Sequence, residues 1–313
     1  MMKNTWNRVL PIMLIGLLLC GCGGEKKEEA SSGAVEKLPS VTQSEETTAE
    51  EQTQQEEVVA PSEIEFDELT VVDNEECLLK ITGIDPSNIW GYSLKALLEN
   101  KSSDKTYMFA VMSAAINGVE SDPLFATEVA PGKKSNETIS FSDSSLQEKG
   151  VGEITDIEIE YRVYDTDDWM ADPVAQDVFH VFPLGEDKAT KYKREAQSTD
   201  VVLADNEHVS VILIGTEEDP IWGYTLNLYI ENKTDRKVMV SVEDVSVNGF
   251  MADPLFAREV GAKRSAFTNI SWMDSAFEEN GIDTVESIEM TMHAYDSENY
   301  GDDYFKDTIT LDF

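Results

Sequence analysis

The feature that most constrains this chain is an internal repeat about 115 residues long. Trp90-Gly91-Tyr92 recurs as Trp222-Gly223-Tyr224, and Asp122-Pro123-Leu124-Phe125-Ala126 recurs as Asp253-Pro254-Leu255-Phe256-Ala257. The two copies are offset by 132 residues up to Lys101 and by 131 from Asn117 onward, as a one-residue difference in a single loop would produce. Solenoid units are only roughly 20–50 residues long. The sequence therefore predicts two copies of a whole domain.

Apolar and polar residues alternate in corresponding segments of both copies. These segments are 77–81, 92–98 and 157–163 in the first copy and 209–213, 224–230 and 288–294 in the second. A period of two places one face of a strand on a core and the other in water. We therefore predict that each copy consists mostly of β-strands.

Turn and cap signals separate these segments. Asn117-Gly118 and Asn248-Gly249 are typical of tight hairpin turns. One short helix is predicted in each copy. In the first copy Asp143 or Ser144 caps it, Leu146 points inward and Gly150 ends it; the corresponding residues of the second copy are Asp274, Phe277 and Gly281. Several short strands with regular turns predict an all-β fold of two tandem two-sheet sandwiches.

The amino terminus has the parts of a bacterial export signal. Lys3 and Arg8 precede an apolar stretch, 9–19, that is too short to span a bilayer, which needs roughly 20 residues. The stretch ends in Leu19-Cys20-Gly21-Cys22, which resembles a lipobox. That resemblance implies cleavage before Cys22 and attachment of a diacylglycerol, with acyl chains such as palmitate, to its thiol.

The segment after Cys22 predicts a tether. Residues 23–62 hold ten glutamates, three lysines and no aromatic residue, so they should form a disordered acidic linker. The predicted organisation is a signal peptide at 1–22, this linker, a first sandwich at 63–183, a second linker at 184–200 and a second sandwich at 201–313. Gly23 and Gly24 fit retention at the outer face of the cytoplasmic membrane in a Gram-positive bacterium.

Three motifs of the second copy support a family resemblance. They are Asn232-Lys233-Thr234, Val247-Asn248-Gly249 and Glu279-Asn280-Gly281-Ile282. Together they resemble a family of uncharacterised Firmicutes lipoproteins with tandem immunoglobulin-like domains; the first copy departs from the pattern at Ile116 and at Lys149-Gly150-Val151. The resemblance covers residues 66–313 and implies an immunoglobulin-like sandwich and a lipid-anchored address. It implies no activity.

Charge and chemistry-bearing residues narrow the function. The net charge of −38 argues against nucleic-acid binding, because such a chain repels phosphates. Cys77 is the only cysteine outside 1–22, which excludes a disulfide framework and favours a buried, unreactive thiol. The histidines, His180, His208 and His293, have no counterparts in the other copy. We therefore predict a protein that is not an enzyme and needs no cofactor.

Two groups of aromatic residues are candidate contact sites. Trp90, Tyr92, Trp222 and Tyr224 flank the start of a strand in each copy, where they could stack on sugar rings; in sandwich domains such residues more often close the end of the core. Phe125 and Phe256 lie in predicted hairpin or edge segments. They are partner-contact candidates if exposed and close the sandwich if buried.

Acidic residues cluster after one strand in each copy and are weak candidates for calcium ligands. The clusters are Asp165, Asp167, Asp168 and Asp172 in the first copy and Asp296, Glu298, Asp302 and Asp303 in the second. Calcium prefers several oxygen ligands from a flexible loop, although neither cluster has EF-hand spacing. The expected role is structural stabilisation at most.

These observations predict a surface-anchored, non-enzymatic binding module, in which two tethered copies could add avidity. A partner protein outside the cytoplasm requires an exposed apolar patch in both copies. A cell-wall glycan requires exposed Trp90 and Trp222. A purely structural spacer, the third alternative, requires only a solvated acidic surface.

Overall fold

The computed structural model describes residues 64–219, 221, 223–254, 256–300 and 303–313. The predicted signal peptide, Cys22 and the acidic linker up to residue 62 lie outside these described residues. Within them, no helix has the length and apolar character needed to cross a bilayer.

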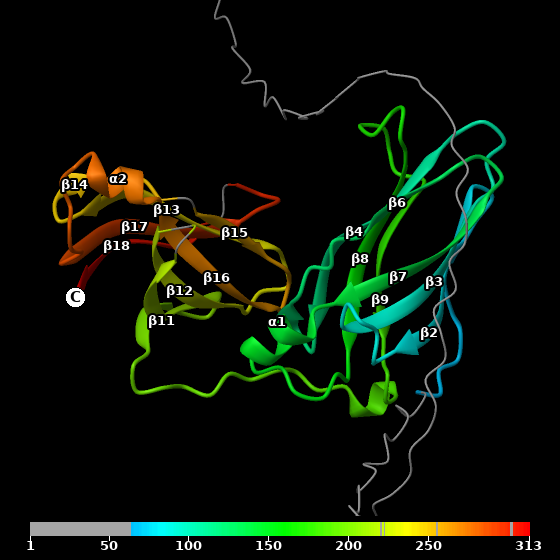
Figure 1. Ribbon diagram of the computed structural model, residues 1–313, viewed down its shortest axis with the longest axis horizontal. Helices are drawn as coiled ribbons and strands as arrows, with labels where there is room; N and C mark the ends of the chain where they lie inside the picture. Colours follow the sequence, from blue (N-terminus) through cyan, green and yellow to red (C-terminus); the bar gives the residue numbers. More distant parts are fainter. Residues whose placement is uncertain (1–63, 220, 222, 255, 301–302) are drawn as a thin grey trace, which may run out of the picture. The chain divides into compact units, whose positions relative to one another are not determined.

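The first repeat is built from two antiparallel sheets (Figure 1). Its elements are β1 (Leu69–Asp73), β2 (Cys77–Asp85), β3 (Tyr92–Asn100), β4 (Tyr107–Ile116), β5 (Val119–Glu120), β6 (Ala126–Val129), β7 (Lys134–Phe141), α1 (Asp143–Glu148), β8 (Ile157–Asp165) and β9 (Ala175–Val181). One sheet has the order β1-β2-β3-β7. The other has the order β5-β4-β8-β9, with β6 also paired to β4.

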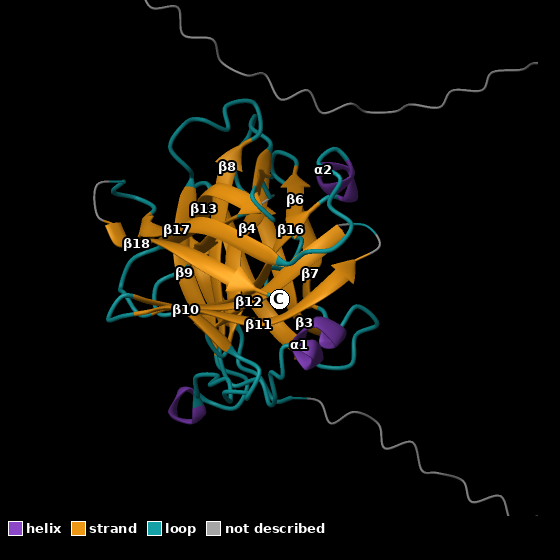
Figure 2. Cartoon of the chain, turned by 90° about the vertical axis from the view of Figure 1, so that its left-hand side faces the viewer, coloured by secondary structure: helices purple, strands orange, loops and turns teal. Residues whose placement is uncertain are grey.

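The second repeat has the same arrangement. Its elements, after the short 3₁₀ helix η1 (Glu186–Lys188), are β10 (Val201–Asp205), β11 (Val209–Asp219), β12 (Gly223–Asn232), β13 (Val238–Val247), β14 (Phe250–Met251), β15 (Ala257–Val260), β16 (Ser265–Trp272), α2 (Asp274–Glu278), β17 (Ser287–Asp296) and β18 (Asp303–Asp312). Its sheets have the orders β10-β11-β12-β16 and β14-β13-β17-β18, with β15 on β13. Strands dominate both repeats (Figure 2), and the predicted all-β fold of tandem immunoglobulin-like sandwiches is confirmed.

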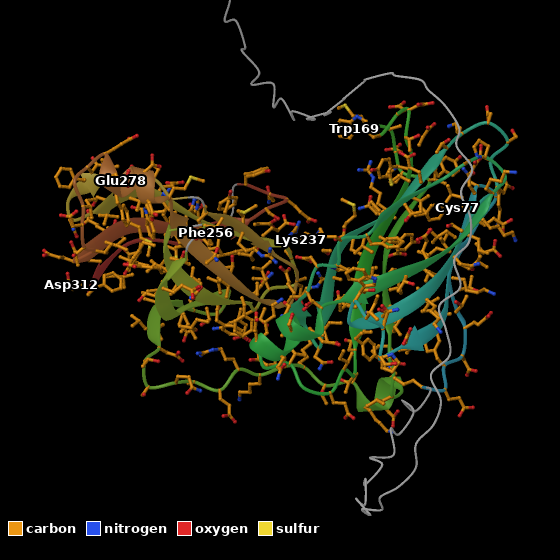
Figure 3. All side chains as sticks on the ribbon, viewed as in Figure 1. Cys77, Trp169, Lys237, Phe256, Glu278 and Asp312 are labelled. Carbon is orange, nitrogen blue, oxygen red and sulfur yellow. The ribbon has the colours of Figure 1, made fainter. Side chains whose placement is uncertain are left out.

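The alternating segments supply the two cores. In β2, Cys77, Leu79 and Ile81 are buried, whereas Leu78 and Lys80 between them are partly exposed. Burial raises the pKa of the Cys77 thiol to about 11, so the side chain behaves as a small hydrophobe (Figure 3). The counterpart of Cys77 in the second core is Val209, which is also fully buried.

Both predicted hairpin turns have the backbone that their sequence requires. Asn117 and Gly118 have φ values of 52° and 81°, and Asn248 and Gly249 have values of 51° and 80°. Positive φ at both central residues is typical of the type I′ turn, whose twist matches that of the flanking strands. These turns connect β4 to β5 and β13 to β14.

The two short helices begin one residue earlier than their predicted caps imply. Ser142 is the N-cap of α1, and its side chain accepts a hydrogen bond from the Ser145 backbone N–H at 3.3 Å. Asp143 is instead the first helical residue, and its carboxylate accepts a hydrogen bond from the Tyr92 backbone N–H at 3.0 Å. The predicted cap is wrong because Asp143 is used to tie α1 to β3. In α2, Met273 occupies the cap position without a side-chain bond.

The segment between the repeats packs against both of them. The Tyr192 backbone N–H donates to the Asn117 carbonyl at 2.8 Å, and its ring meets the Phe267 ring edge-on at 6.1 Å. Arg194 forms a bidentate ion pair with Asp200, with N–O distances of 2.7 and 2.8 Å, and its guanidinium lies over the Tyr229 ring. The predicted linker at 184–200 therefore contacts both repeats through Tyr192 and Arg194.

The Arg194–Asp200 pair predicts a loss of stability in acid. Its hydrogen bonds lower the pKa of the Asp200 carboxyl from 3.8 to about 2. A depressed pKa contributes stability that is present above pH 4 and is lost as the pH falls toward 2. We expect the melting temperature of the wild type to fall more steeply than that of Asp200→Asn across this window. Parallel curves for the two proteins would contradict the prediction.

Candidate functional site

The Trp-Gly-Tyr motif of the first repeat separates its two aromatic side chains. The Trp90 side chain is 73% exposed, and its backbone N–H donates to the Asn88 side chain at 3.0 Å. Gly91, at φ 103°, fits closely against the end of β7, and Tyr92 is buried in the core. Tyr92 therefore has the predicted role of closing the end of the core. Trp90 instead projects into solvent next to the exposed Ile89.

The Asp-Pro-Leu-Phe motif is divided in the same way. Leu124 is fully exposed, whereas Phe125 is half-buried against the first core. Asp122 holds the segment in place by accepting a hydrogen bond from the Ala114 backbone N–H at 3.2 Å. Phe125 therefore packs on the sandwich, and its neighbour Leu124, which sequence reasoning missed, is the exposed apolar side chain. Which of these two neighbouring residues faces the core depends on the path of the segment over the sandwich, and the local sequence does not give that path.

One cleft brings the two motifs together. It has a volume of about 510 Å³, and Trp90, Pro123 and Leu124 contribute to its lining. Its remaining wall comes from the end of β7 and from α1, including Ser142 and Lys149. Burial lowers the pKa of the Lys149 ammonium, which donates to the Glu120 carbonyl at 2.9 Å. The cleft is thus lined by both apolar and polar side chains.

The second repeat shows part of the same arrangement. Ile221, the counterpart of Ile89, is exposed, and Tyr224 packs partly against the second core. Phe256 is likewise half-buried against that core (Figure 3). Trp222 and Leu255 lie outside the described residues.

The acidic clusters are mostly engaged in ion pairs and turns. Asp296 is fully buried, pairs with Arg236 at 2.7 Å and accepts the Glu298 backbone N–H at 2.9 Å. Asp165 pairs with Lys105 at 3.3 Å and accepts the Asp167 backbone N–H at 3.0 Å. Over the described ranges, which omit Asp302, no three acidic, histidine or cysteine side chains are grouped as metal ligands would be. Among the described calcium candidates, the structure therefore forms no group of three ligands.

A polar interface joins the repeats, and sequence reasoning missed it. β16 pairs in parallel with β5 through Ser265 and Val119, which merges one sheet from each repeat into a nine-stranded sheet. The Ser265 backbone N–H donates to the Gly118 carbonyl at 2.8 Å. Glu120, only 6% exposed, accepts the Gly261 backbone N–H at 2.8 Å and forms an ion pair with Arg258.

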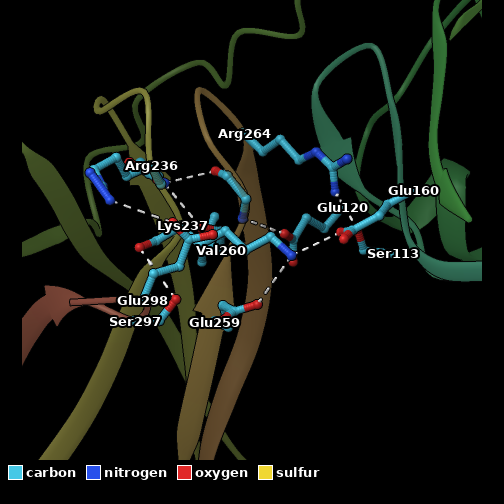
Figure 4. A network of polar contacts seen from close by, with 12 residues as sticks. Ser113, Glu120, Glu160, Arg236, Lys237, Glu259, Val260, Arg264, Ser297 and Glu298 are labelled. Carbon is cyan, nitrogen blue, oxygen red and sulfur yellow. Dashed lines mark hydrogen bonds and ion pairs between the residues drawn. The ribbon is translucent and has the colours of Figure 1, made fainter. Parts of the chain in front are cut away.

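Three further ion pairs cross this interface. Arg258 also pairs with Asp122 at 3.2 Å. Figure 4 shows the pair of Lys237 with Glu160 and the position of Arg264. The buried Arg264 pairs with Glu158 at 3.2 Å and donates to the Ser113 hydroxyl at 3.1 Å. Lys237 pairs with Glu160 at 2.8 Å, which lowers the pKa of that carboxyl against the effect of its burial. The first repeat supplies the acids of all four pairs and the second supplies the bases.

The comparisons with known proteins assign no family to this chain. No protein-family model and no curated protein matches it. Among solved structures, a red sea bream transglutaminase matches 77% of this chain at 10% identity and a TM-score of 0.24. A protein of unknown function from Porphyromonas gingivalis W83 matches 79% of the chain at 11% identity and a TM-score of 0.20, over 99% of its own length. The chain spans only 31% of the transglutaminase.

Proposed function

We propose that this protein is a non-enzymatic binding module, anchored through Cys22 at the outer face of the cytoplasmic membrane, and that it binds a partner protein there. The observation that supports the proposal most is the convergence of two motifs. The motifs containing Trp90 and Leu124 are far apart in the sequence and recur in both copies, yet in the first repeat they expose apolar side chains at one cleft.

The exposed apolar side chains at and beside the Trp90 cleft indicate a surface that is covered by a binding partner. Leaving Ile89, Trp90 and Leu124 in water forgoes the roughly 1.5–3 kcal/mol that burying each large apolar side chain contributes. Tryptophan is also among the residues that contribute most to protein interfaces. Polar side chains that line the same cleft, such as Ser142 and Lys149, would supply the hydrogen-bonding groups that such interfaces also contain.

A cell-wall glycan is the second candidate ligand. The hydroxyl groups of Ser140 and Ser142 line the same cleft as Trp90. An indole ring beside hydroxyl groups is the combination that stacks on and hydrogen-bonds to a sugar. The protein partner is favoured because Ile89 and Leu124 add flexible aliphatic surface, which packs well against other apolar side chains but poorly on a sugar face.

In-cell cross-linking tests the proposal. The full chain and a Trp90→Ala/Leu124→Ala variant would be cross-linked in intact cells, and the captured proteins identified by mass spectrometry. We expect one dominant partner, reduced at least tenfold by the double variant. The control is Trp169→Ala, since Trp169 is 62% exposed on a different loop (Figure 3). A Cys22→Ala chain gives the background without the anchor.

The possible results separate the alternatives. Equal capture by the wild type and the Trp90→Ala/Leu124→Ala variant would contradict the cleft as the contact surface. If nothing is captured above the Cys22→Ala background, the protein-binding proposal is wrong. Binding of the wild type, but not of the double variant, to purified cell wall would then favour the glycan.

A further inference from the structure

The interface between the repeats uses a surface of the first repeat that the second repeat also possesses. The docking element is the β4–β5 hairpin, whose tip lies against β16 and Gly261. In the second repeat the corresponding hairpin is β13–β14, in which Phe250 and Met251 take the places of Val119 and Glu120. Val119 is fully buried, whereas Phe250 is 49% and Met251 is 64% exposed.

The complementary surface is also present twice. In the second repeat, β16 is held between β12 and β5. Its counterpart in the first repeat, β7, pairs with β3 alone among the described strands, so its outer edge is open. Lys134, at the start of β7, corresponds to Ser265, because β3 and β12 pair with these strands in the same register. Among the described residues, the chain therefore has one exposed docking hairpin and one receiving edge without a paired strand.

We infer that copies of this chain associate head to tail, with β14 of one copy docking on the start of β7 in the next. This repeats the existing contact between the two repeats across two molecules. An interface of this kind joins two different surfaces, so it can continue from copy to copy instead of closing into a pair.

The side chains that would face each other between two copies differ in pairs from those that face each other inside the chain. Glu120 and Arg258 pair inside the chain, and their counterparts are Met251 and Thr127, both uncharged. The same holds for Glu160 and Lys237, whose counterparts are Thr291 and Thr106. The buried acid of each pair is thus absent together with its base. Asp122, which also pairs with Arg258 at 3.2 Å, has the exposed Asp253 as its counterpart, and this carboxylate would face Thr127.

The third pair keeps its charges. Inside the chain, Arg264 meets Glu158. Their counterparts are Lys133 and Glu289, a base and an acid in the same orientation, and both are exposed. The contacts made by Glu120, Glu158 and Glu160 are thus each matched in charge between two copies, whereas Asp253 would face the uncharged Thr127. Since unmatched charges disfavour wrong partners, this complementarity favours a second copy of the chain as the occupant.

The association between copies should be weaker than the contact inside the chain. The internal contact is reinforced by Tyr192 and Arg194 of the connecting segment, which cannot bridge two molecules in the same way. It also has the advantage of a covalent link, which raises the effective concentration of the two surfaces. We therefore expect an association that depends on protein concentration.

Disulfide trapping tests the geometry. Paired strands lie roughly 4.8 Å apart, and a disulfide can form between residues whose Cα atoms are roughly 4.4–6.8 Å apart. Full chains carrying Phe250→Cys and, separately, Lys134→Cys would be given different tags and oxidised together in intact cells. We expect a mixed disulfide dimer, and a ladder of larger species when one chain carries both cysteines. Phe250→Cys combined with Trp169→Cys is the mismatched control.

Sedimentation of the purified full chain gives a second, independent measurement. The average mass of the wild type should rise with concentration, and Phe250→Asp/Met251→Asp should keep the chain monomeric. Met273→Asp, which alters another exposed apolar residue of the same repeat, should still associate. A monomer at every concentration, or a mixed dimer no more abundant than in the mismatched control, would overturn the inference. Because neither readout involves the Trp90 cleft, the proposed binding function stands or falls separately.

Discussion

Replacing Gly91 with alanine is expected to destabilise the first repeat by about 4 kcal/mol, at the upper end of single-residue effects. Two causes add. Gly91 has a φ of 103°, which side chains rarely adopt, and an added Cβ would lie 2.1 Å from the Phe141 carbonyl oxygen. That oxygen belongs to the backbone of β7, so relief requires β7 and β3 to separate. This separation of the strands would also displace Trp90, which precedes Gly91 in the turn.

The control for this prediction is Gly132→Ala. Gly132 also has a positive φ, 64°, but nothing lies within 4 Å of its Cβ position. Only the backbone strain remains there, about 1–2 kcal/mol. Hydrogen exchange measured by mass spectrometry should show faster exchange in β3 and β7 for Gly91→Ala than for Gly132→Ala. If the two variants exchange alike, close packing does not explain the glycine. Gly223→Ala should reproduce the effect in the second repeat, where a Cβ would lie 2.2 Å from the Trp272 carbonyl oxygen.

Replacing Arg258 with alanine is expected to cost about 3 kcal/mol at neutral pH, because it leaves the buried Glu120 carboxylate without its counter-ion. This is the low end of the range for breaking buried pairs, since the Arg258 side chain is itself partly exposed. Burial raises the pKa of Glu120 above 4.5, so the charged form is already disfavoured in the folded protein. The loss should therefore appear as the pH rises above 4.5 and shrink again in mild acid.

A double variant separates the charge effect from a loss of packing. Glu120→Met/Arg258→Thr introduces the residue types that the chain carries at the corresponding positions, Met251 and Thr127. Replacing a buried ion pair by uncharged residues is often neutral. We expect urea unfolding at pH 7 to show most of the stability recovered in the double variant. A double variant that is less stable than Arg258→Ala would show that the ion pair stabilises the interface beyond neutralising Glu120.

Local patterns were enough to predict the strands and turns of each repeat. The alternation through Cys77, Leu79 and Ile81 settles which face is buried, because a strand has only two faces. Asn117-Gly118 determines its own turn because both residues tolerate positive φ. The helix cap at Asp143 was predicted incorrectly because that carboxylate bonds to β3, which is 51 positions away in the sequence. The local sequence cannot show that a distant backbone N–H takes the hydrogen bond that would otherwise cap the helix.

The candidate site was only partly predictable. The repeat identified both motifs, yet their patterns do not distinguish Tyr92, which is buried, from Trp90, which is exposed. That difference comes from the turn at Gly91, which directs the two side chains apart. Leu124 is exposed and Phe125 is half-buried for the same kind of reason, since the path of the segment over the core decides which of two neighbours faces inward.

The sequence by itself determined the duplication, the strand pattern and the all-β fold, because each of these is a periodic property of neighbouring residues. Only the tertiary structure decided which motifs meet at the Trp90 cleft and how the repeats are joined. Glu120 and Arg258 are 138 positions apart, and neither is unusual in so acidic a chain. Their pairing depends on β5 and β16 lying side by side, and contacts between residues so far apart arise from the packing of whole domains.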